Sequence, residues 1–248
     1  MRRPWLSIAV LSVILTALGE FAVWTWSMLP TGYSREAEIV DDAYVLLLAL
    51  AVPVFAFVIA MLVYSAVRFR TKGPPTEDGP PMTGSSRIVA IWLVVTGLLA
   101  LVILVNPGIV GLADLRADQT ADLVIDVQAQ RWSWNITYPN GGTTSEELVV
   151  PVDVRVRFDV TSLDILHSFW VPAFRAKIDA VPGRTTQLYL TPDRAGSSVD
   201  DPTLRLQCAE LCGLGHAQMV IQVRVVSEAE FDAWVSGLEG ATAAEEGA

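Results

Sequence analysis

The sequence predicts a membrane-anchored all-β protein, in which transmembrane helices precede a β-sandwich or Greek-key barrel. Three observations support this prediction. The composition is 52% hydrophobic and only 18% charged over 248 residues, which is unusual for a soluble domain of this size. Apolar runs long enough to cross a bilayer are confined to the first 113 residues. The remainder consists of short stretches rich in Val, Ile, Leu and Thr, without intervening helical patterns.

Three apolar runs account for the first half: Trp5 to Leu29, Ala43 to Val67, and Ile88 to Ala113. Each is longer than the roughly 20 residues that span the hydrocarbon core as a helix. Residues 31–113 are therefore predicted to form a transmembrane helical hairpin. Residues 1–30 are a transmembrane helix or a signal peptide, because two arginines, an apolar core and small residues follow one another there. We favour the retained helix, since the apolar run continues to Leu29.

The charges in the loops predict the orientation. Basic residues precede the first run and flank the loop between the second and third, at Arg68, Arg70, Lys72 and Arg87. The loop from Thr31 to Asp42 is mainly acidic. The positive-inside rule then places the basic segments in the cytoplasm and everything after Ala113 outside. We expect a multi-pass protein of the cell membrane whose C-terminal domain is extracytoplasmic.

The net charge of −10 lies entirely in the C-terminal part. Up to Ala113 there are seven basic and seven acidic residues. From Asp114 onward there are ten basic and twenty acidic residues. This excess argues against nucleic acid as a partner and suits a cationic one. An acidic surface that serves only solubility is the alternative. The high apolar content excludes a disordered chain, and two cysteines exclude a disulfide-rich scaffold.

Residues 114–239 are predicted to form the β domain. Stretches that alternate or enrich apolar residues predict its strands, at 123–126, 149–160, 186–190, 203–207 and 220–226. Glu228 to Leu238 has an apolar side and predicts one terminal helix. The tail, residues 240–248, is predicted to be disordered.

One loop concentrates the soft ligands of the chain. Cys208, Cys212, His216 and Met219 follow the spacing Cys-x3-Cys-x3-His-x2-Met, and His167 lies upstream, where it would come from a neighbouring strand. Thiolate, imidazole and a weak thioether together are typical of electron-transfer copper sites. A Cys208–Cys212 disulfide and a tetrahedral zinc site are the alternatives. The copper interpretation is stronger, because every Cys and every His of the chain falls into one pattern.

With these residues in place, the chain resembles subunit II of the haem–copper cytochrome c oxidases. The likeness covers the second and third helices and the β domain, and it implies a cupredoxin-like fold for residues 114–239. The loop matches the binuclear copper A motif of that family at each ligand position. The resemblance implies that Cys208 and Cys212 bridge two coppers, His167 and Met219 complete one, and His216 and the Glu210 carbonyl complete the other. It also implies that the Glu210 side chain binds magnesium or manganese at the interface with subunit I, beside the segment Lys177 to Arg184.

The family resemblance also suggests where electrons enter. Gln130-Arg131-Trp132-Ser133-Trp134 is similar to an aromatic segment of the family whose first tryptophan faces cytochrome c. Trp132 is therefore the expected point of electron entry, with the acidic surface steering a lysine-rich cytochrome. The alternative is that Trp132 and Trp134 both pack a core from one face of a strand. The sequence also departs from the family: Ser133 replaces an aromatic residue, and Val89 stands where a glutamate often lies near a proton-uptake path.

The resemblance implies a function in a complex. The chain would accept electrons from cytochrome c and pass them to the haem of subunit I, where oxygen reduction is coupled to proton translocation. It would work with subunit I and other oxidase subunits, and it would be inactive alone. The alternatives are the copper A subunit of a nitric oxide reductase, with the same loop and anchors, and a membrane-anchored copper carrier.

Overall fold

The computed structural model describes residues 4–26, 28–70, 73 and 84–245. The chain divides into two compact units. The first comprises Met1–Leu29 and Asp42–Ala113, and the second comprises Pro30–Asp41 and Asp114–Ala248. The short segment Pro30–Asp41 thus groups with the β-rich unit, although the sequence assigns Pro30 to the first helix or signal peptide and residues 31–41 to the helical hairpin.

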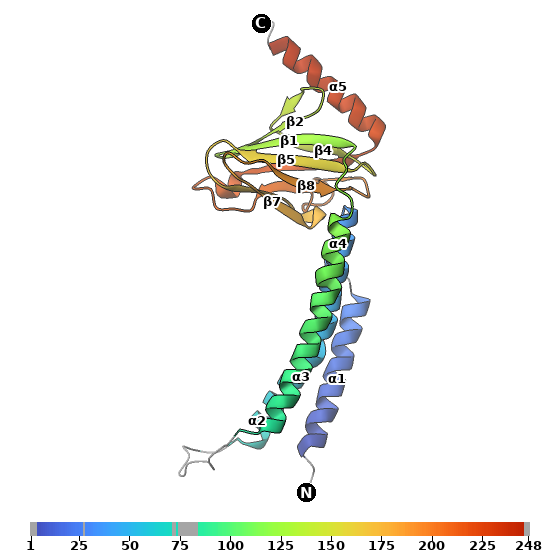
Figure 1. The fold of residues 1–248 in the computed structure, drawn as a ribbon, viewed down its shortest axis with the longest axis vertical. Coiled ribbons are helices and arrows are strands. Elements are labelled where there is room, and N and C mark those ends of the chain that lie inside the picture. Colours follow the sequence, from blue (N-terminus) through green and yellow to red (C-terminus); the bar gives the residue numbers. More distant parts are fainter. Residues whose placement is uncertain (1–3, 27, 71–72, 74–83, 246–248) are drawn as a thin grey trace. The chain divides into compact units, whose positions relative to one another are not determined.

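Apolar helices make up the first unit. In chain order they are α1 (Pro4–Thr25), α2 (Arg35–Arg68), α3 (Ser86–Ile103), the π-helical turn η1 (Leu104–Ile109) and α4 (Val110–Arg116). Within the described residues, three helical stretches are long and apolar enough to cross a membrane: Trp5–Thr25, Arg35–Arg68 and Ser86–Arg116. Their large apolar side chains are mostly exposed, as lipid-facing helices require. The predicted membrane anchor is therefore present (Figure 1).

Helices α1 and α2 approach each other closely at Gly19. A Cβ atom at this position would lie 2.7 Å from Cγ1 of Val52. Small residues allow such close packing between membrane helices, where hydrophobic burial supplies little driving force. Glu20, the single acid of the first run, accepts a hydrogen bond from Nε1 of Trp24 at 3.2 Å, one turn along the same helix.

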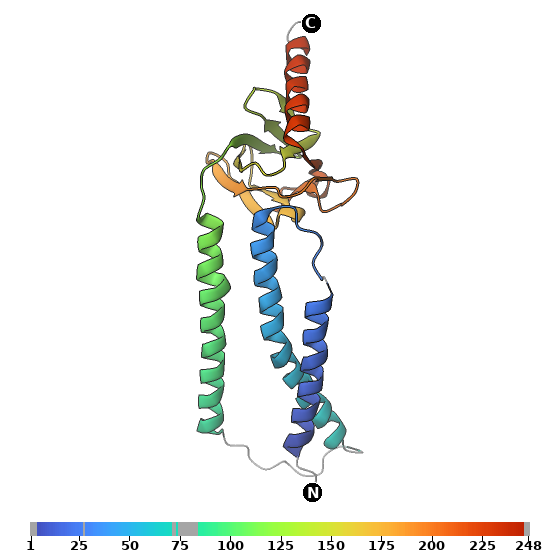
Figure 2. The same ribbon diagram turned by 90° about the vertical axis from the view of Figure 1, so that its right-hand side faces the viewer.

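Two sheets form the second unit. The spatial order is β3–β2–β1–β5–β8 in one sheet and β4–β11–β10–β6–β7 in the other, with the short β9 paired to β11. The strands are β1 (Leu123–Gln130), β2 (Ser133–Thr137), β3 (Thr143–Thr144), β4 (Glu147–Pro151), β5 (Val156–Ser162), β6 (His167–Val171), β7 (Ala176–Ala180), β8 (Thr186–Leu190), β9 (Gly196–Ser197), β10 (Arg205–Cys208) and β11 (Val220–Val226). Two 3₁₀ turns, η2 (Pro172–Phe174) and η3 (His216–Gln218), lie between them. The predicted fold class, helices followed by a cupredoxin-like sandwich, is confirmed (Figure 2).

Alternation of side chains builds the core. Along β5, residues at every second position are buried, beginning with Val156, Phe158 and Val160. Partners from the other sheet include Phe169 and Leu206, both fully buried. This arrangement is the period of two that the sequence indicates, since successive strand side chains point to opposite faces. The core therefore lies between the sheets and holds the strands that carry the site.

The residues 149–160, which the sequence pattern joins, form two strands in different sheets. β4 ends at Pro151 and β5 begins at Val156. Asp153 between them has φ of 61°, a left-handed conformation that Asp tolerates better than most residues. The apolar alternation continues through this turn, so it cannot by itself reveal the break.

Helix α5 (Glu228–Glu245) is longer than the sequence indicates. Its first part covers β3 and β4, with the Trp234 indole donating to a carboxylate oxygen of Glu147 at 3.1 Å. The sequence predicts a disordered tail from residue 240 onward, but the helix continues through residues 240–245. Ala and Glu in this stretch are good helix formers, which explains the difference. Residues 246–248 of that tail lie outside the described residues.

Segment 30–41, which contains the first turn of α2, is attached to the β sandwich by several contacts. The backbone N–H of Tyr33 donates to the carbonyl of Ala173, and that of Arg35 donates to the carbonyl of Thr191. Glu36 forms a mostly buried ion pair with Arg155, at 10% and 13% side-chain exposure. Asp41 pairs with Arg175 at 2.7 Å. These contacts explain why the segment belongs to the second unit.

Candidate metal centre

Neighbouring strands of one sheet position the first two ligand candidates. His167 begins β6 and Cys208 ends β10. These strands are antiparallel neighbours in which Cys208 stands opposite Phe169, two residues from His167. The register therefore brings an imidazole and a thiol to the same end of the sheet. The loop that leaves β10 supplies the remaining candidates before the chain returns along β11.

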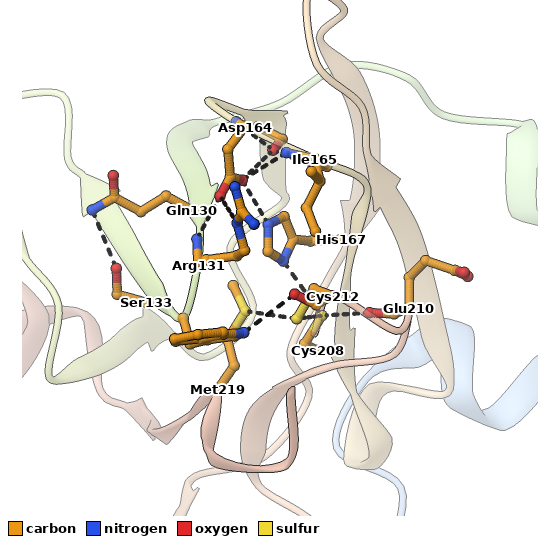
Figure 3. A network of polar contacts seen from close by, with 12 residues as sticks. Gln130, Arg131, Ser133, Asp164, Ile165, His167, Cys208, Glu210, Cys212 and Met219 are labelled. Carbon is orange, nitrogen blue, oxygen red and sulfur yellow. Dashed lines mark hydrogen bonds and ion pairs between the residues drawn. The ribbon is translucent and has the colours of Figure 1, made fainter. Parts of the chain in front are cut away.

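All six predicted ligand residues converge around the two sulfur atoms. Sγ of Cys208 lies 3.7 Å from Nδ1 of His167 and 3.1 Å from the carbonyl oxygen of Glu210. Sγ of Cys212 lies 3.6 Å from Nδ1 of His216 and 3.9 Å from Sδ of Met219. The sulfurs are 3.8 Å apart (Figure 3). Each thiol thus has one imidazole and one weaker donor beside it.

The donor set fits a soft metal. Both cysteines are free thiols, so the disulfide alternative does not describe this structure. His167, Cys208 and Cys212 offer ligand atoms that all lie within 4.8 Å of one another. Six donors converge, which exceeds the four of a tetrahedral zinc site. Sulfur, imidazole and thioether together favour copper.

Burial shields these donors from water. His167 is fully buried, and Cys208, Cys212 and Met219 are 7%, 1% and 1% exposed. Burial, and secondly the neighbouring Cys208, raise the pKa of the Cys212 thiol to about 11. Without metal this cysteine is therefore protonated at neutral pH, and metal binding must release its proton.

Asp164 lies behind His167, on the side away from the sulfurs. Its Oδ1 is 2.9 Å from Nε2 of His167 and accepts a hydrogen bond from the Ile165 N–H at 2.7 Å. Its Oδ2 accepts from the backbone N and the Nε of Arg131, at 3.0 and 2.9 Å. Burial alone would raise the pKa of this carboxyl, but these hydrogen bonds outweigh burial and hold it well below its usual range. Asp164 is therefore a carboxylate that can only accept (Figure 3).

The two tryptophans of the aromatic segment occupy different environments. Trp134, on β2, is fully buried, and its Nε1 lies 3.4 Å from the carbonyl oxygen of Met219. Trp132 precedes β2 and is 43% exposed. Its indole Nε1 donates to the carbonyl of Cys212 at 3.2 Å. The interpretation of both rings as core residues therefore holds for Trp134 but not for Trp132.

The Trp132 ring rests on the two glycines of the ligand loop. A Cβ atom at Gly215 would lie 2.4 Å from Cδ2 of Trp132, and one at Gly213 would lie 3.5 Å from Cζ2. Gly213 also has φ of +111°, which strongly favours glycine. The loop can therefore contact the ring only because these positions lack side chains.

Of Glu210, the structure brings only the backbone carbonyl to the two sulfurs. Its backbone carbonyl faces Cys208, while its carboxylate is directed away from the sulfurs (Figure 3). The sequence pattern predicted no role for Asp164 or Arg131. An acid three residues before a ligand histidine is the pattern that could have identified Asp164.

Comparisons with known proteins agree on one family. The family model described as "Cytochrome C oxidase subunit II, periplasmic domain" matches residues 142–226. "Cytochrome c oxidase subunit 2" of Cereibacter sphaeroides is 31% identical over 243 residues, which cover 81% of this chain and 76% of the relative. The relative of the same name from Thermostichus vulcanus is 26% identical, over 90% of this chain and 82% of its own length.

Two other matches cover only about half of one of the two aligned chains. "Cytochrome c oxidase subunit 2" of Bacillus sp. (strain PS3) is 34% identical, but the matched region spans only 51% of that longer relative. Among solved structures, the periplasmic domain of subunit II of cytochrome oxidase (CoxB) of Bradyrhizobium japonicum is 34% identical. That match covers 49% of this chain and 96% of that domain, with a TM-score of 0.45.

Proposed function

The chain belongs to the cytochrome c oxidase subunit II family, and from this we propose that it receives electrons from cytochrome c at a binuclear copper centre. It then passes them to the haem-bearing subunit I of its complex, where oxygen is reduced and protons are translocated. One observation carries this proposal. Two imidazoles, a thioether and a backbone carbonyl each lie within 3.9 Å of one of two free thiols, whose sulfurs are 3.8 Å apart.

The residues of this chain have separate tasks in the proposed function. Cys208 and Cys212 would hold both coppers, with His167, His216, Met219 and the Glu210 carbonyl completing the set. When bound, such a pair takes up and releases one electron that both metals share. The sheet that carries His167 and Cys208 resists displacement, so the ligands change position little between oxidation states. Burial of the ligands excludes water and competing ligands.

Trp132 is the proposed point at which electrons arrive. Its ring is partly exposed to solvent while its Nε1 donates to the carbonyl of the ligand Cys212. One aromatic side chain therefore connects the protein surface with the copper loop. The acidic excess of the C-terminal part would steer a cationic cytochrome toward this domain.

Glu210 is also proposed to bind magnesium or manganese through its side chain, as the family resemblance implies. Its carboxylate is directed away from the sulfurs, so the copper ligands do not compete for it (Figure 3). A hard cation there would need further oxygen ligands. Subunit I would supply them, beside the segment Lys177 to Arg184.

Burial disfavours the copper carrier. A carrier must exchange its metal, which requires accessible ligands, whereas four of the ligand side chains here are at most 7% exposed. The nitric oxide reductase alternative would use the same centre with a different catalytic partner. The matched relatives reported above are named as oxidase subunits, which favours the oxidase.

Copper analysis of the purified full chain tests the proposal. We expect two coppers per chain and a seven-line hyperfine pattern in the EPR spectrum, because one unpaired electron shared by two equivalent copper nuclei gives this pattern. One copper with a four-line spectrum, or no copper with Cys208 and Cys212 oxidised to each other, would contradict the binuclear centre.

A further inference from the structure

The side chain of Asp164 joins two parts of the site that lie far apart in sequence. One oxygen faces Nε2 of His167, and the other accepts two hydrogen bonds from Arg131. Arg131 immediately precedes Trp132, whose indole donates to the carbonyl of Cys212. Cys212 in turn lies 3.8 Å from Cys208, which contacts His167. The contacts therefore form a closed ring around the ligand loop.

We propose that Asp164 is a positioning residue that selects the nitrogen His167 presents to copper and anchors the Trp132 segment to the copper loop. The proposal rests on the function proposed above, since His167 is positioned for a metal. The Asp164 carboxylate faces His167 and Arg131 rather than the two sulfurs. It acts through its two neighbours, one a ligand and the other the residue before Trp132.

The chemistry of the contact determines the tautomer of His167. A carboxylate can only accept hydrogen bonds, so Nε2 of His167 must carry the proton at 2.9 Å from Oδ1. In a neutral imidazole, Nδ1 is then the free lone pair, and Nδ1 is the atom 3.7 Å from Sγ of Cys208. His167 is fully buried, so water cannot replace this partner. Histidine ligands commonly depend on such an acceptor for orientation.

The second oxygen fixes the Trp132 segment. Arg131 donates from both its backbone N and its Nε to Oδ2, which holds the main chain and the side chain together. The next residue places its ring against Gly213 and Gly215. A single carboxylate thus contacts both the histidine and the residue that precedes the tryptophan.

Nitrogen NMR of the metal-free full chain in detergent, labelled with ¹⁵N in its histidine rings, tests the first half directly. The sequence contains two histidines, so His216 serves as an internal reference for His167. In mildly alkaline buffer we expect His167 to be the Nε2–H tautomer. The Asp164→Asn variant should shift His167 toward a mixture and leave His216 unchanged. Asn is similar in size but can offer Nε2 either its oxygen or its amide hydrogens.

Copper competition against a chelator supplies the second readout. We expect Asp164→Asn to lower the copper affinity about 10- to 100-fold and to alter the EPR hyperfine splitting. The matched control is Asp201→Asn, which removes a carboxylate that accepts hydrogen bonds from Thr203, outside the ring of contacts. This control should keep the native tautomer and affinity.

Different outcomes overturn different statements. A native chain whose His167 is mainly the Nδ1–H tautomer overturns the positioning role, even if the Asn variant fails to fold. A folded Asp164→Asn chain with native tautomer and native copper affinity overturns it as well. A native chain that keeps the Nε2–H tautomer but binds no copper pair contradicts the proposed function instead.

Discussion

At the residue scale, two glycines decide how Trp132 meets the copper loop. Gly213 is needed for its backbone conformation, since its φ is +111°. Gly215 has φ of −90°, which any residue adopts, so it is needed only for space. Replacement of Gly215 by Ala therefore probes the contact with Trp132 without straining the loop backbone.

We expect Gly215→Ala to displace the Trp132 ring, because the new Cβ would lie 2.4 Å from Cδ2. Copper content should be unchanged, since every ligand remains. The rate of electron acceptance from cytochrome c by the assembled complex should fall about 10- to 100-fold, measured by stopped-flow. Gly237→Ala is the control, because nothing lies within 4 Å of a Cβ there. An unchanged rate for Gly215→Ala would show that electrons do not enter through Trp132.

Asp201 gives a prediction for pH. Hydrogen bonds from the Thr203 hydroxyl and then from the Thr203 N–H lower the pKa of this carboxyl in the folded chain. Its stabilising contribution is therefore complete above the unfolded value of about 3.9 and is lost as the pH falls through the folded value. Asp201→Asn should flatten the loss of stability below about pH 4, followed by near-UV circular dichroism. Acid unfolding curves of identical steepness would contradict this.

At the element scale, the first turn of α2 is part of the β unit. Arg155 is central to this attachment, because it pairs with Glu36 and also donates to the backbone carbonyl of Asp118 at 2.8 Å. Glu36 further accepts from the Thr191 N–H at 2.8 Å. One arginine therefore joins the first turn of α2 to the residues just after α4.

Arg155→Ala should destabilise the second unit by about 3–5 kcal/mol, because it leaves the buried Glu36 carboxylate without its cation. Thermal unfolding of the full chain in detergent, followed by near-UV circular dichroism, measures this loss. Arg35→Ala is the matched control. It breaks an exposed pair with Asp153, at 62% and 66% side-chain exposure, and should cost at most about 1 kcal/mol. Equal effects of the two variants would show that burial of the Glu36 pair is unimportant.

The strands show how far the sequence pattern reaches. Strands β8 and β11 were predicted at their observed bounds, since apolar and β-branched residues mark them clearly. The apolar pattern did not predict β6 or β7, although His167 was expected to lie on a strand. β6 reads His-Ser-Phe-Trp-Val, with buried polar residues at its start, and β7 contains a lysine and an aspartate. Their strand character comes from pairing with neighbours that are distant in sequence.

The convergence of the candidate ligands was predicted more completely than their surroundings. Spacing within one loop identifies Cys208, Cys212, His216 and Met219, because chain neighbours must lie close together. Asp164 and Arg131 are 33 residues apart, and only the fold shows that they meet. The packing of Trp132 on Gly213 and Gly215 likewise depends on tertiary structure. Contacts between distant segments were thus the part that periodicity and spacing could not supply.

At the scale of the whole molecule, charge and hydropathy separate the two halves of the chain. The residues up to Ala113 carry no net charge, and those from Asp114 onward carry −10. The apolar half supplies the membrane anchor, and the family model that matches residues 142–226 is described as a periplasmic domain. A long-range field therefore arises only from the half that would meet a soluble partner.

This field predicts a dependence on salt. The second-order rate constant for a lysine-rich cytochrome c reacting with the assembled complex should fall as ionic strength rises, because screening shortens the range of attraction to about 10 Å at 0.1 M. For a cytochrome of net negative charge, the rate constant should be small at low salt and should rise when salt is added. A rate constant that is independent of salt for both cytochromes would show that the acidic surface serves solubility alone.

The attachment of segment 30–41 to the sandwich also has a consequence for biogenesis. Glu36 and Asp41 leave the ribosome well before Arg155 and Arg175, their partners in the finished protein. Until Arg155 and Arg175 are made, these carboxylates have no cationic partner and must stay in water, at the start of a helix whose remainder is apolar. The domain therefore closes onto a part of the chain that is already in place. These ion pairs can therefore form only after the chain has been made at least as far as Arg175.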